Sequence, residues 1–183
     1  MSDKKEPVSS LRQWGTIQTV KKGAQSGDSG YLCAIRISFS KHGSQNDKLL
    51  ELSASLLDAA VFAADSSVKK INVTRWDSGA FILAEFQNEV TAEIEINLGL
   101  PKSMPGIYFV TAFCSEGIIT NHPLAGYFNP GGVLQADENS CKTLLVDRDI
   151  CEDEIEQAKC RAAADEIPPV SHDIIDLLKD FFQ

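Results

Sequence analysis

The chain has 183 residues and a formal net charge of −9 at pH 7; 43% of its residues are hydrophobic and 23% are charged. This composition suits one globular domain, and the acidic balance excludes nucleic acid and an anionic membrane surface as main partners, since both need a basic patch. No segment predicts a transmembrane span or a secretory signal, so we expect a cytoplasmic protein with a disordered segment at 1–7 and a single domain at 8–183.

The first third of the sequence predicts a helix, a strand and a second helix. Apolar residues at helical spacing predict a helix over 9–22 that ends at Gly23. The glycine-rich GAQSGDSG, residues 23–30, is expected to be a turn, because it precedes a strand and offers no helix N-terminus to a phosphate. Alternating aromatic and branched residues predict the strand over 31–40. The run KLLELSASLLDAAVFA predicts a helix over 48–64 that is apolar on almost every side.

A series of short strands follows, each bounded by turn signals. The predicted strands are 68–76, 79–88, 90–100, 106–115, 117–122 and 142–149. The second and third meet at Asn88-Glu89, which leaves room only for a tight hairpin. In TAEIEINL the alternation places Glu93 and Glu95 on one face and Ile94 and Ile96 on the other, so the sheet has at least one polar face.

The tail predicts a charged helix over 151–165 and a closing amphipathic helix over 172–182, with Ser171 as its N-cap and Asp173 near the positive end of the helix dipole. Strands bracketed by helices predict an α+β fold. We expect a mostly antiparallel β-sheet of about six strands with the helices packed on one face.

Motifs that carry chemistry are absent from the sequence. It has no G-x-G-x-x-G, no phosphate-binding P-loop, no H-E-x-x-H and no G-x-S-x-G. The three histidines are far apart, and the five cysteines contain no C-x-x-C pair, so no metal site is predicted. We interpret the cysteines as reduced thiols and expect Cys33 and Cys114 to be buried.

The order of elements over residues 8–182 resembles the C-terminal domain of the glucose-fructose oxidoreductase, inositol dehydrogenase and rhizopine-catabolism family (Gfo/Idh/MocA), a dihydrodipicolinate-reductase-like fold. The resemblance rests on the G-x-x-G turn before a strand, on FQNEV at 86–90, on CSEG at 114–117 and on IPPVSHDIIDLLKDFF at 167–182. In FQNEV, Glu89 stands where the family usually has glycine. The resemblance implies that the helix over 48–64 lines a substrate cleft and that the open face of the sheet makes subunit contacts.

Family dehydrogenases carry on this helix an aspartate and, four residues on, a histidine that act together on the sugar hydroxyl. The matching positions here are Glu51 and Ser55, with Asp58 at a further acidic position. A serine hydroxyl cannot replace a histidine base, because it has no accessible proton affinity near neutral pH. We therefore assign no catalytic residue. The polar stripe of Glu51, Ser55 and Asp58 is either a degenerate ligand-binding site or the solvated edge of a buried helix.

The family's enzymes also begin with a Rossmann domain that binds NAD or NADP, for which this chain has no room, so we predict no cofactor. Three hypotheses stay open. The chain is a stand-alone substrate-domain homologue, not active alone, that acts by homo-oligomerisation through the sheet face or by binding a small sugar or polyol. Alternatively, it is half of a split oxidoreductase completed by a Rossmann partner, or it is a fragment of a longer oxidoreductase.

Overall fold

The computed structural model describes residues 11–43, 46–122, 133–137, 140–144 and 169–182. Three helices and eight strands lie in these ranges: α1 (Gly15–Ser26), β1 (Leu32–Ser40), α2 (Asn46–Ala64), β2 (Val68–Trp76), β3 (Gly79–Phe86), β4 (Thr91–Asn97), β5 (Ile107–Cys114), β6 (Gly117–Thr120), β7 (Val133–Asp137), β8 (Cys141–Leu144) and α4 (His172–Lys179). The predicted segment 1–7 and helix 151–165 lie outside the described residues.

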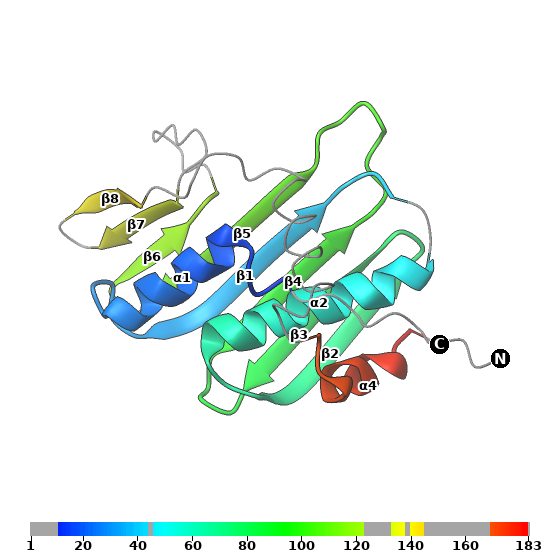
Figure 1. The fold of residues 1–183 in the computed structure, drawn as a ribbon, viewed down its shortest axis with the longest axis horizontal. Helices are drawn as coiled ribbons and strands as arrows, with labels where there is room; N and C mark the ends of the chain where they lie inside the picture. The colour runs from blue at the N-terminus through cyan, green and yellow to red at the C-terminus, as the bar shows by residue number, and fades with distance from the viewer. Residues whose placement is uncertain (1–10, 44–45, 123–132, 138–139, 145–168, 183) are drawn as a thin grey trace.

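All eight strands form one sheet in the order β2-β3-β4-β1-β5-β6-β7-β8 (Figure 1). β1 lies inside the sheet, where it runs parallel to β4 and antiparallel to β5. The other neighbouring strands are antiparallel, so two meanders, β2 to β4 and β5 to β8, flank β1. The predicted α+β class with a mostly antiparallel sheet is confirmed, with eight strands where about six were expected.

The register places apolar side chains in rows across one face of the sheet. On this covered face Ile37 of β1 is paired with Ile94 of β4 and with Val110 of β5, and Ile94 is paired with Ile82 of β3. All four are fully buried. The intervening residues point to the opposite side, which we call the open face. The polar face expected from TAEIEINL is confirmed, since Glu95 is exposed there.

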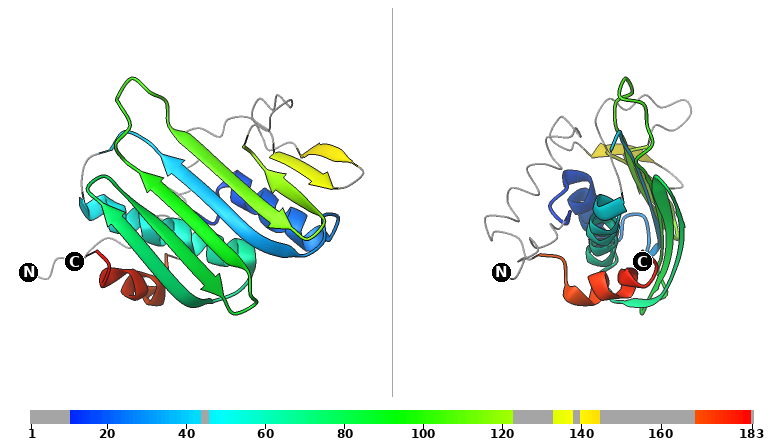
Figure 2. Two further views of the ribbon diagram at one scale, coloured as in Figure 1. Left: turned by 180° about the vertical axis from the view of Figure 1, so that it is seen from behind. Right: turned by 90° about the vertical axis from the view of Figure 1, so that its right-hand side faces the viewer.

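The helices cover one face of the sheet, as predicted (Figure 2). α2 packs on β1, β3 and β4, α1 packs beside it on β5 and β6, and α4 packs against α2. The core between the two layers includes Trp14, Ile17 and Leu57, each fully buried. None of the helices in the described ranges has the length and apolar composition needed to cross a bilayer.

The boundaries of α1 differ from the predicted 9–22. The helix begins at Gly15, after a turn that contains Arg12, and ends at Ser26. Its C-cap, Gly27, has a φ of 74°, the left-handed conformation that glycine adopts easily. The predicted stop, Gly23, lies inside the helix. A side chain there would bring its Cβ within 2.6 Å of Ile119 Cδ1 on β6, so the glycine allows close helix–sheet packing.

The closing helix α4 follows the prediction at its start. The Ser171 hydroxyl accepts a hydrogen bond from the Ile174 amide at 3.4 Å, and Asp173 lies in the first turn. Ile174 and Leu178 are buried on the face toward the core. The helix ends at Lys179, three residues before the predicted 182, where a turn follows.

Candidate functional site

The polar stripe of α2 divides into an exposed part and a buried part. Glu51 is exposed, whereas Ser55 is 7% exposed and Asp58 is fully buried. Within the stripe, the Ser55 hydroxyl donates a hydrogen bond to the Glu51 backbone carbonyl at 2.9 Å. This bond runs back one helical turn, as buried serines in helices often do. The structure therefore does not bring the three side chains together on one exposed surface.

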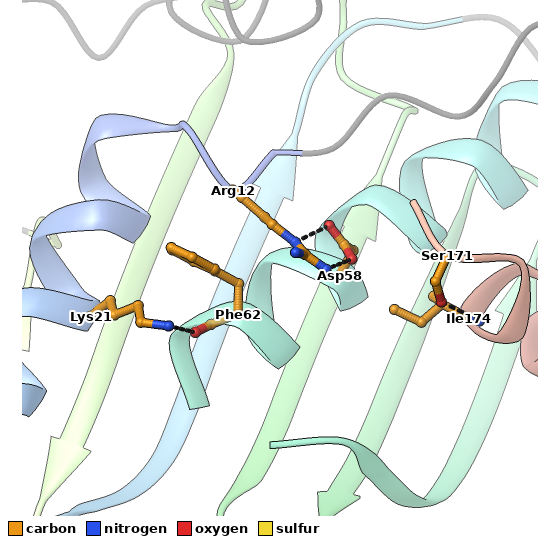
Figure 3. Close-up of polar contacts among 6 residues, drawn as sticks. All are labelled: Arg12, Lys21, Asp58, Phe62, Ser171 and Ile174. Atoms are coloured by element: carbon orange, nitrogen blue, oxygen red, sulfur yellow. Dashed lines mark hydrogen bonds and ion pairs between the residues drawn. The ribbon is translucent and has the colours of Figure 1, made fainter. Parts of the chain in front are cut away.

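Asp58 is held by an arginine from the turn before α1. Arg12 Nε donates to Oδ2 at 2.9 Å and Arg12 Nη2 donates to Oδ1 at 2.7 Å, so the guanidinium binds both carboxylate oxygens (Figure 3). The Arg12 side chain is 30% exposed and Asp58 is fully buried. Because a buried carboxylate costs free energy unless it is paired, this contact accounts for the presence of Asp58 inside the molecule.

Two other arginines, Arg36 and Arg75, lie elsewhere in the fold. Arg36 lies between inward-facing neighbours of β1 and so points to the open face, where it pairs with Glu93. Arg75 lies on the edge strand β2, with its guanidinium 6.0 Å from the centre of the Phe182 ring. No sequence signal singled out Arg12, because an arginine in a short turn has no characteristic spacing.

The ion pair belongs to a larger contact between α1 and α2. Phe62, one turn after Asp58, has Arg12 5.9 Å and Lys21 4.0 Å from its ring centre. Lys21 Nζ also donates to the Phe62 carbonyl at 3.0 Å (Figure 3). The same nitrogen donates to Asp65 Oδ1 at 3.0 Å. A cation at the Phe62 carbonyl is favourable because the last backbone carbonyls of α2 form the negative end of the helix dipole. The cluster joins the two helices.

The C-terminus of α2 is also tied to the predicted hairpin between β3 and β4. Asn88 Nδ2 donates to the Ala64 carbonyl at 2.9 Å, and the Glu89 amide donates to the Phe86 carbonyl at 3.1 Å. Glu89 has a φ of 67°, the left-handed region that favours glycine. The Asn88-Glu89 hairpin is confirmed, and the bond from Asn88 to α2 is a contact that the sequence did not predict.

The glycine-rich turn before β1 is a structural contact. A Cβ at Gly30 would lie 2.1 Å from Ser115 Oγ. The Ser29 carbonyl accepts from the Glu116 amide at 3.1 Å, and the Ser29 hydroxyl accepts from Gln135 Nε2 at 3.0 Å. Because this turn leads into a strand and its groups are engaged by β5–β7, it does not fit the phosphates of a dinucleotide, which bind where such a turn opens a helix.

No three His, Cys, Asp or Glu side chains come together as metal ligands would within the described ranges.

Cys33 and Cys114 are half-buried, which is less than the full burial expected for them. On the open face, a hydrogen bond and charge attraction join Lys69 to Glu85. They raise the pKa of Lys69 and lower the pKa of Glu85.

The open face carries large apolar side chains that are exposed. Phe81 is 39% exposed and Leu83 43% on β3, Trp76 is 41% exposed on β2, and Phe113 is 38% exposed on β5. Ion pairs lie among them: Arg36 with Glu93, and Lys69 with Glu85. The Arg36 guanidinium is 5.8 Å from the centre of the Phe113 ring. This face therefore combines apolar and charged groups of both signs on one surface.

Several solved structures of oxidoreductases share this arrangement. An oxidoreductase from Thermotoga maritima superposes with a TM-score of 0.63 at 16% identity, covering 95% of this chain and 58% of the other. Aldose-aldose oxidoreductase from Caulobacter crescentus, complexed with glycerol, gives a TM-score of 0.62 at 8% identity, covering 97% and 61%. An inositol dehydrogenase homologue from Azotobacter vinelandii, complexed with NADH and myo-inositol, gives 0.56 at 12% identity, covering 76% and 42%.

No family model matches the sequence, and no curated protein matches it. The fold is that of Gfo/Idh/MocA-type oxidoreductases, and the match is consistent with their C-terminal domain alone. The chain spans less than two thirds of the length of the matched oxidoreductases. At these identities the likeness establishes the fold, and the activities of those proteins are not thereby transferred.

Proposed function

We propose that this chain is a stand-alone homologue of the substrate domain of NAD-dependent sugar oxidoreductases, not catalytic by itself, which acts by self-association through the open face of its sheet. The observation that carries the proposal is the set of exposed apolar side chains on that face: Trp76, Phe81, Leu83 and Phe113. Large apolar groups clustered on one surface commonly mark an interface with another protein.

The charges of the open face favour a second copy of this chain as the partner. Arg36 and Glu93 lie near its centre, and Lys69 and Glu85 lie toward its edge. A two-fold interface places the same surface of two copies against each other. Because the open face carries both positive and negative side chains, the positive groups of one copy can pair with the negative groups of the other. The six neighbouring strands β2, β3, β4, β1, β5 and β6 make a surface roughly 25 Å wide, and each of the longer strands is roughly 25 Å long. The resulting area is of the order that a standard protein–protein interface needs on each partner.

Light scattering of two matched variants tests this proposal. Phe81→Lys combined with Leu83→Lys places charge in the proposed interface, whereas Leu177→Lys makes the same kind of change on α4, where Leu177 is 41% exposed. We expect wild type and Leu177→Lys to have twice the 20.0 kDa chain mass and the double variant to have the chain mass itself. A wild-type protein that stays at 20.0 kDa throughout the micromolar range would contradict the proposal.

The absence of catalysis by this chain alone is supported by the two buried groups of α2. Ser55 stands where the resemblance places a histidine base, and its hydroxyl is directed to the Glu51 carbonyl. The Asp58 carboxylate is bound through both oxygens by Arg12. Neither arrangement provides a group that takes a proton from a substrate hydroxyl at neutral pH.

A second candidate role is binding of a small polyol at the degenerate site of Glu51, Ser55 and Asp58. Glycerol in the Caulobacter protein and myo-inositol in the Azotobacter protein favour ligands of this class. The exposed Glu51 carboxylate is the member of the site that can accept hydroxyl hydrogen bonds without breaking an ion pair. Isothermal titration with myo-inositol and glycerol tests this role: heat of binding that disappears in Glu51→Ala would support it, and absence of heat would remove it.

Completion by a separate Rossmann protein is favoured by the coverage of the matched oxidoreductases, since this chain spans 58% of the Thermotoga protein and 42% of the Azotobacter protein. The fluorescence of NADH with this chain alone tests whether the chain has a cofactor site of its own. We expect no enhancement, because the glycine-rich turn does not fit a dinucleotide. Binding of NADH by the chain alone would contradict the proposal that this domain has no cofactor site of its own.

A further inference from the structure

Two cysteines lie at the same end of neighbouring strands. Cys33 is on β1 and Cys114 closes β5, and these strands pair antiparallel. The register pairs Leu32 with Cys114 and Ala34 with Phe113, so Cys33 is the extra residue of a β-bulge. In a bulge two residues of one strand oppose a single residue of the other. Cys33 therefore lies beside the position that faces Cys114.

The spacing of the two strands suits a disulfide. Residues opposite each other in an antiparallel pair have Cα atoms about 4.5–5.5 Å apart, within the range of about 4.4–6.8 Å found in disulfides. Both thiols are reduced and half-buried. Cys114 and its partner in the register, Leu32, pack against the core from the covered face, and Cys33 directly follows Leu32.

The chemistry of the two thiols differs. Burial, and next to it the charge of Cys33, raises the pKa of Cys114 to about 11, so Cys114 keeps its proton at neutral pH. The Cys33 thiol donates to the Tyr31 carbonyl at 3.6 Å in an exposed contact, so peroxide in solvent reaches Cys33 more easily than the more buried Cys114. The first attack on an oxidant therefore falls to Cys33.

We propose that Cys33 and Cys114 form a dithiol pair that a peroxide oxidises reversibly to a cross-strand disulfide. The Cys33 thiol releases its proton and the thiolate attacks one peroxide oxygen. The O–O bond breaks, Cys33 becomes a sulfenic acid, and the departing hydroxide takes up the released proton to form one water. Cys114 sulfur then attacks Cys33 sulfur, the S–O bond breaks, and the departing hydroxide takes the Cys114 proton to form a second water. Two thiols lose two electrons and two protons, and a dithiol reductant reverses the change.

The cysteine pair is independent of the proposed self-association, although Cys114 lies next to the open face of the sheet. Cys114 follows Phe113 of the open face and precedes Ser115, whose amide donates to the Tyr31 carbonyl at 2.9 Å. A disulfide would fix the bulged end of β1 to β5, beside the glycine-rich turn. Its formation needs no second copy of the chain, so failure of either proposal leaves the other standing.

Peptide mapping of the full chain tests the dithiol. The background variant Cys141→Ser, Cys151→Ser, Cys160→Ser keeps only Cys33 and Cys114, and its circular dichroism should match wild type. After treatment with hydrogen peroxide, we expect a linked peptide that contains both residues, with two hydrogen atoms fewer, and its loss on addition of dithiothreitol. The same treatment of wild type should give the same linked peptide, which keeps the test valid if the triple variant folds poorly.

Two single changes serve as controls. Cys33→Ser and Cys114→Ser, each in the background variant, should abolish the link, and Cys114→Ser should leave Cys33 as a sulfenic acid that dimedone traps. The proposal is overturned if both thiols of the native protein remain open to alkylation after peroxide, or if oxidation stops at separate sulfinic acids or joins two chains without the internal link.

Discussion

Helix α2 and the open face of the sheet both carry ion pairs, but the pairs differ in their surroundings. Asp58 is fully buried and bound through both oxygens by Arg12. On the open face the side chains of Arg36 and Glu93 are 57% and 37% exposed. Buried pairs are expensive to break, whereas exposed pairs contribute little to stability. The comparison teaches that Asp58, the last residue of the polar stripe, is used for packing, whereas the exposed apolar side chains lie on the other side of the sheet.

The largest expected effect comes from breaking the buried pair. Arg12→Ala leaves the Asp58 carboxylate inside the molecule without its guanidinium, and we expect a loss of about 3 kcal/mol in the free energy of unfolding. Arg36→Ala, the matched change on the open face, should cost less than about 1 kcal/mol. Urea denaturation of both variants measures the difference. Equal losses would contradict the assignment of one pair to the core and the other to the surface.

Neighbouring residues of β3 sharpen the same comparison. Ile82 faces the core and is fully buried, and Leu83 faces outward and is 43% exposed. Ile82→Ala should lower the unfolding free energy by about 2–4 kcal/mol, because it leaves a cavity. Leu83→Ala should change it by no more than about 0.5 kcal/mol when the protein is dilute. Thermal denaturation at low protein concentration gives both values, and a large loss for Leu83→Ala would mean that the open face is part of the folded core.

The hairpin that holds the end of α2 gives a smaller effect of opposite sign. Glu89 adopts a left-handed conformation, which costs a residue with a Cβ about 1–2 kcal/mol. Glu89→Gly relieves this cost but increases the entropy of the unfolded chain, so we expect a net stabilisation of about 0.5 kcal/mol. Glu89→Ala keeps the Cβ and serves as the control. A glycine variant no more stable than the alanine variant would show that the backbone of the turn is not strained.

The smallest effect is expected at Ser55. Its hydroxyl bonds within its own helix, and alanine is the stronger helix former, so Ser55→Ala should change stability by no more than about 0.5 kcal/mol. Chemical denaturation together with binding of myo-inositol by the variant measures two separate properties. A loss of polyol binding without a loss of stability would favour the degenerate ligand site over a purely structural stripe.

The strands and the two faces of the sheet could be predicted from the sequence because alternation is a local signal. Ile94 and Glu95 differ in burial as their alternation requires, and Asn88-Glu89 forms the expected turn. The place of β1 between β4 and β5 could not be read from the order of strands, since the pairing joins segments far apart in the chain. β7 was missed, because Val133–Asp137 is short and lacks a clear alternation.

The candidate site was predicted less well for a similar reason. The spacing of Glu51, Ser55 and Asp58 correctly places them along one helix, but the burial of each depends on what packs over that helix. Arg12 approaches from a turn 46 positions earlier in the sequence, and no local pattern marks such a partner. The resemblance identified the fold and directed attention to α2, yet the contacts that determine what Asp58 does became visible only in three dimensions.

Hydroxyl-radical footprinting at two protein concentrations tests the central claim most directly, because it reports which face of the molecule becomes covered. Trp76, Phe81 and Phe113 lie on the open face, and Phe181, also 38% exposed, lies just after α4 on the helix side. Between about 1 µM and about 100 µM, a range in which interfaces of this size commonly associate, oxidation of the three open-face residues should fall several-fold while oxidation of Phe181 stays constant. Unchanged oxidation of all four residues, or protection of Phe181 alone, would contradict self-association through the open face.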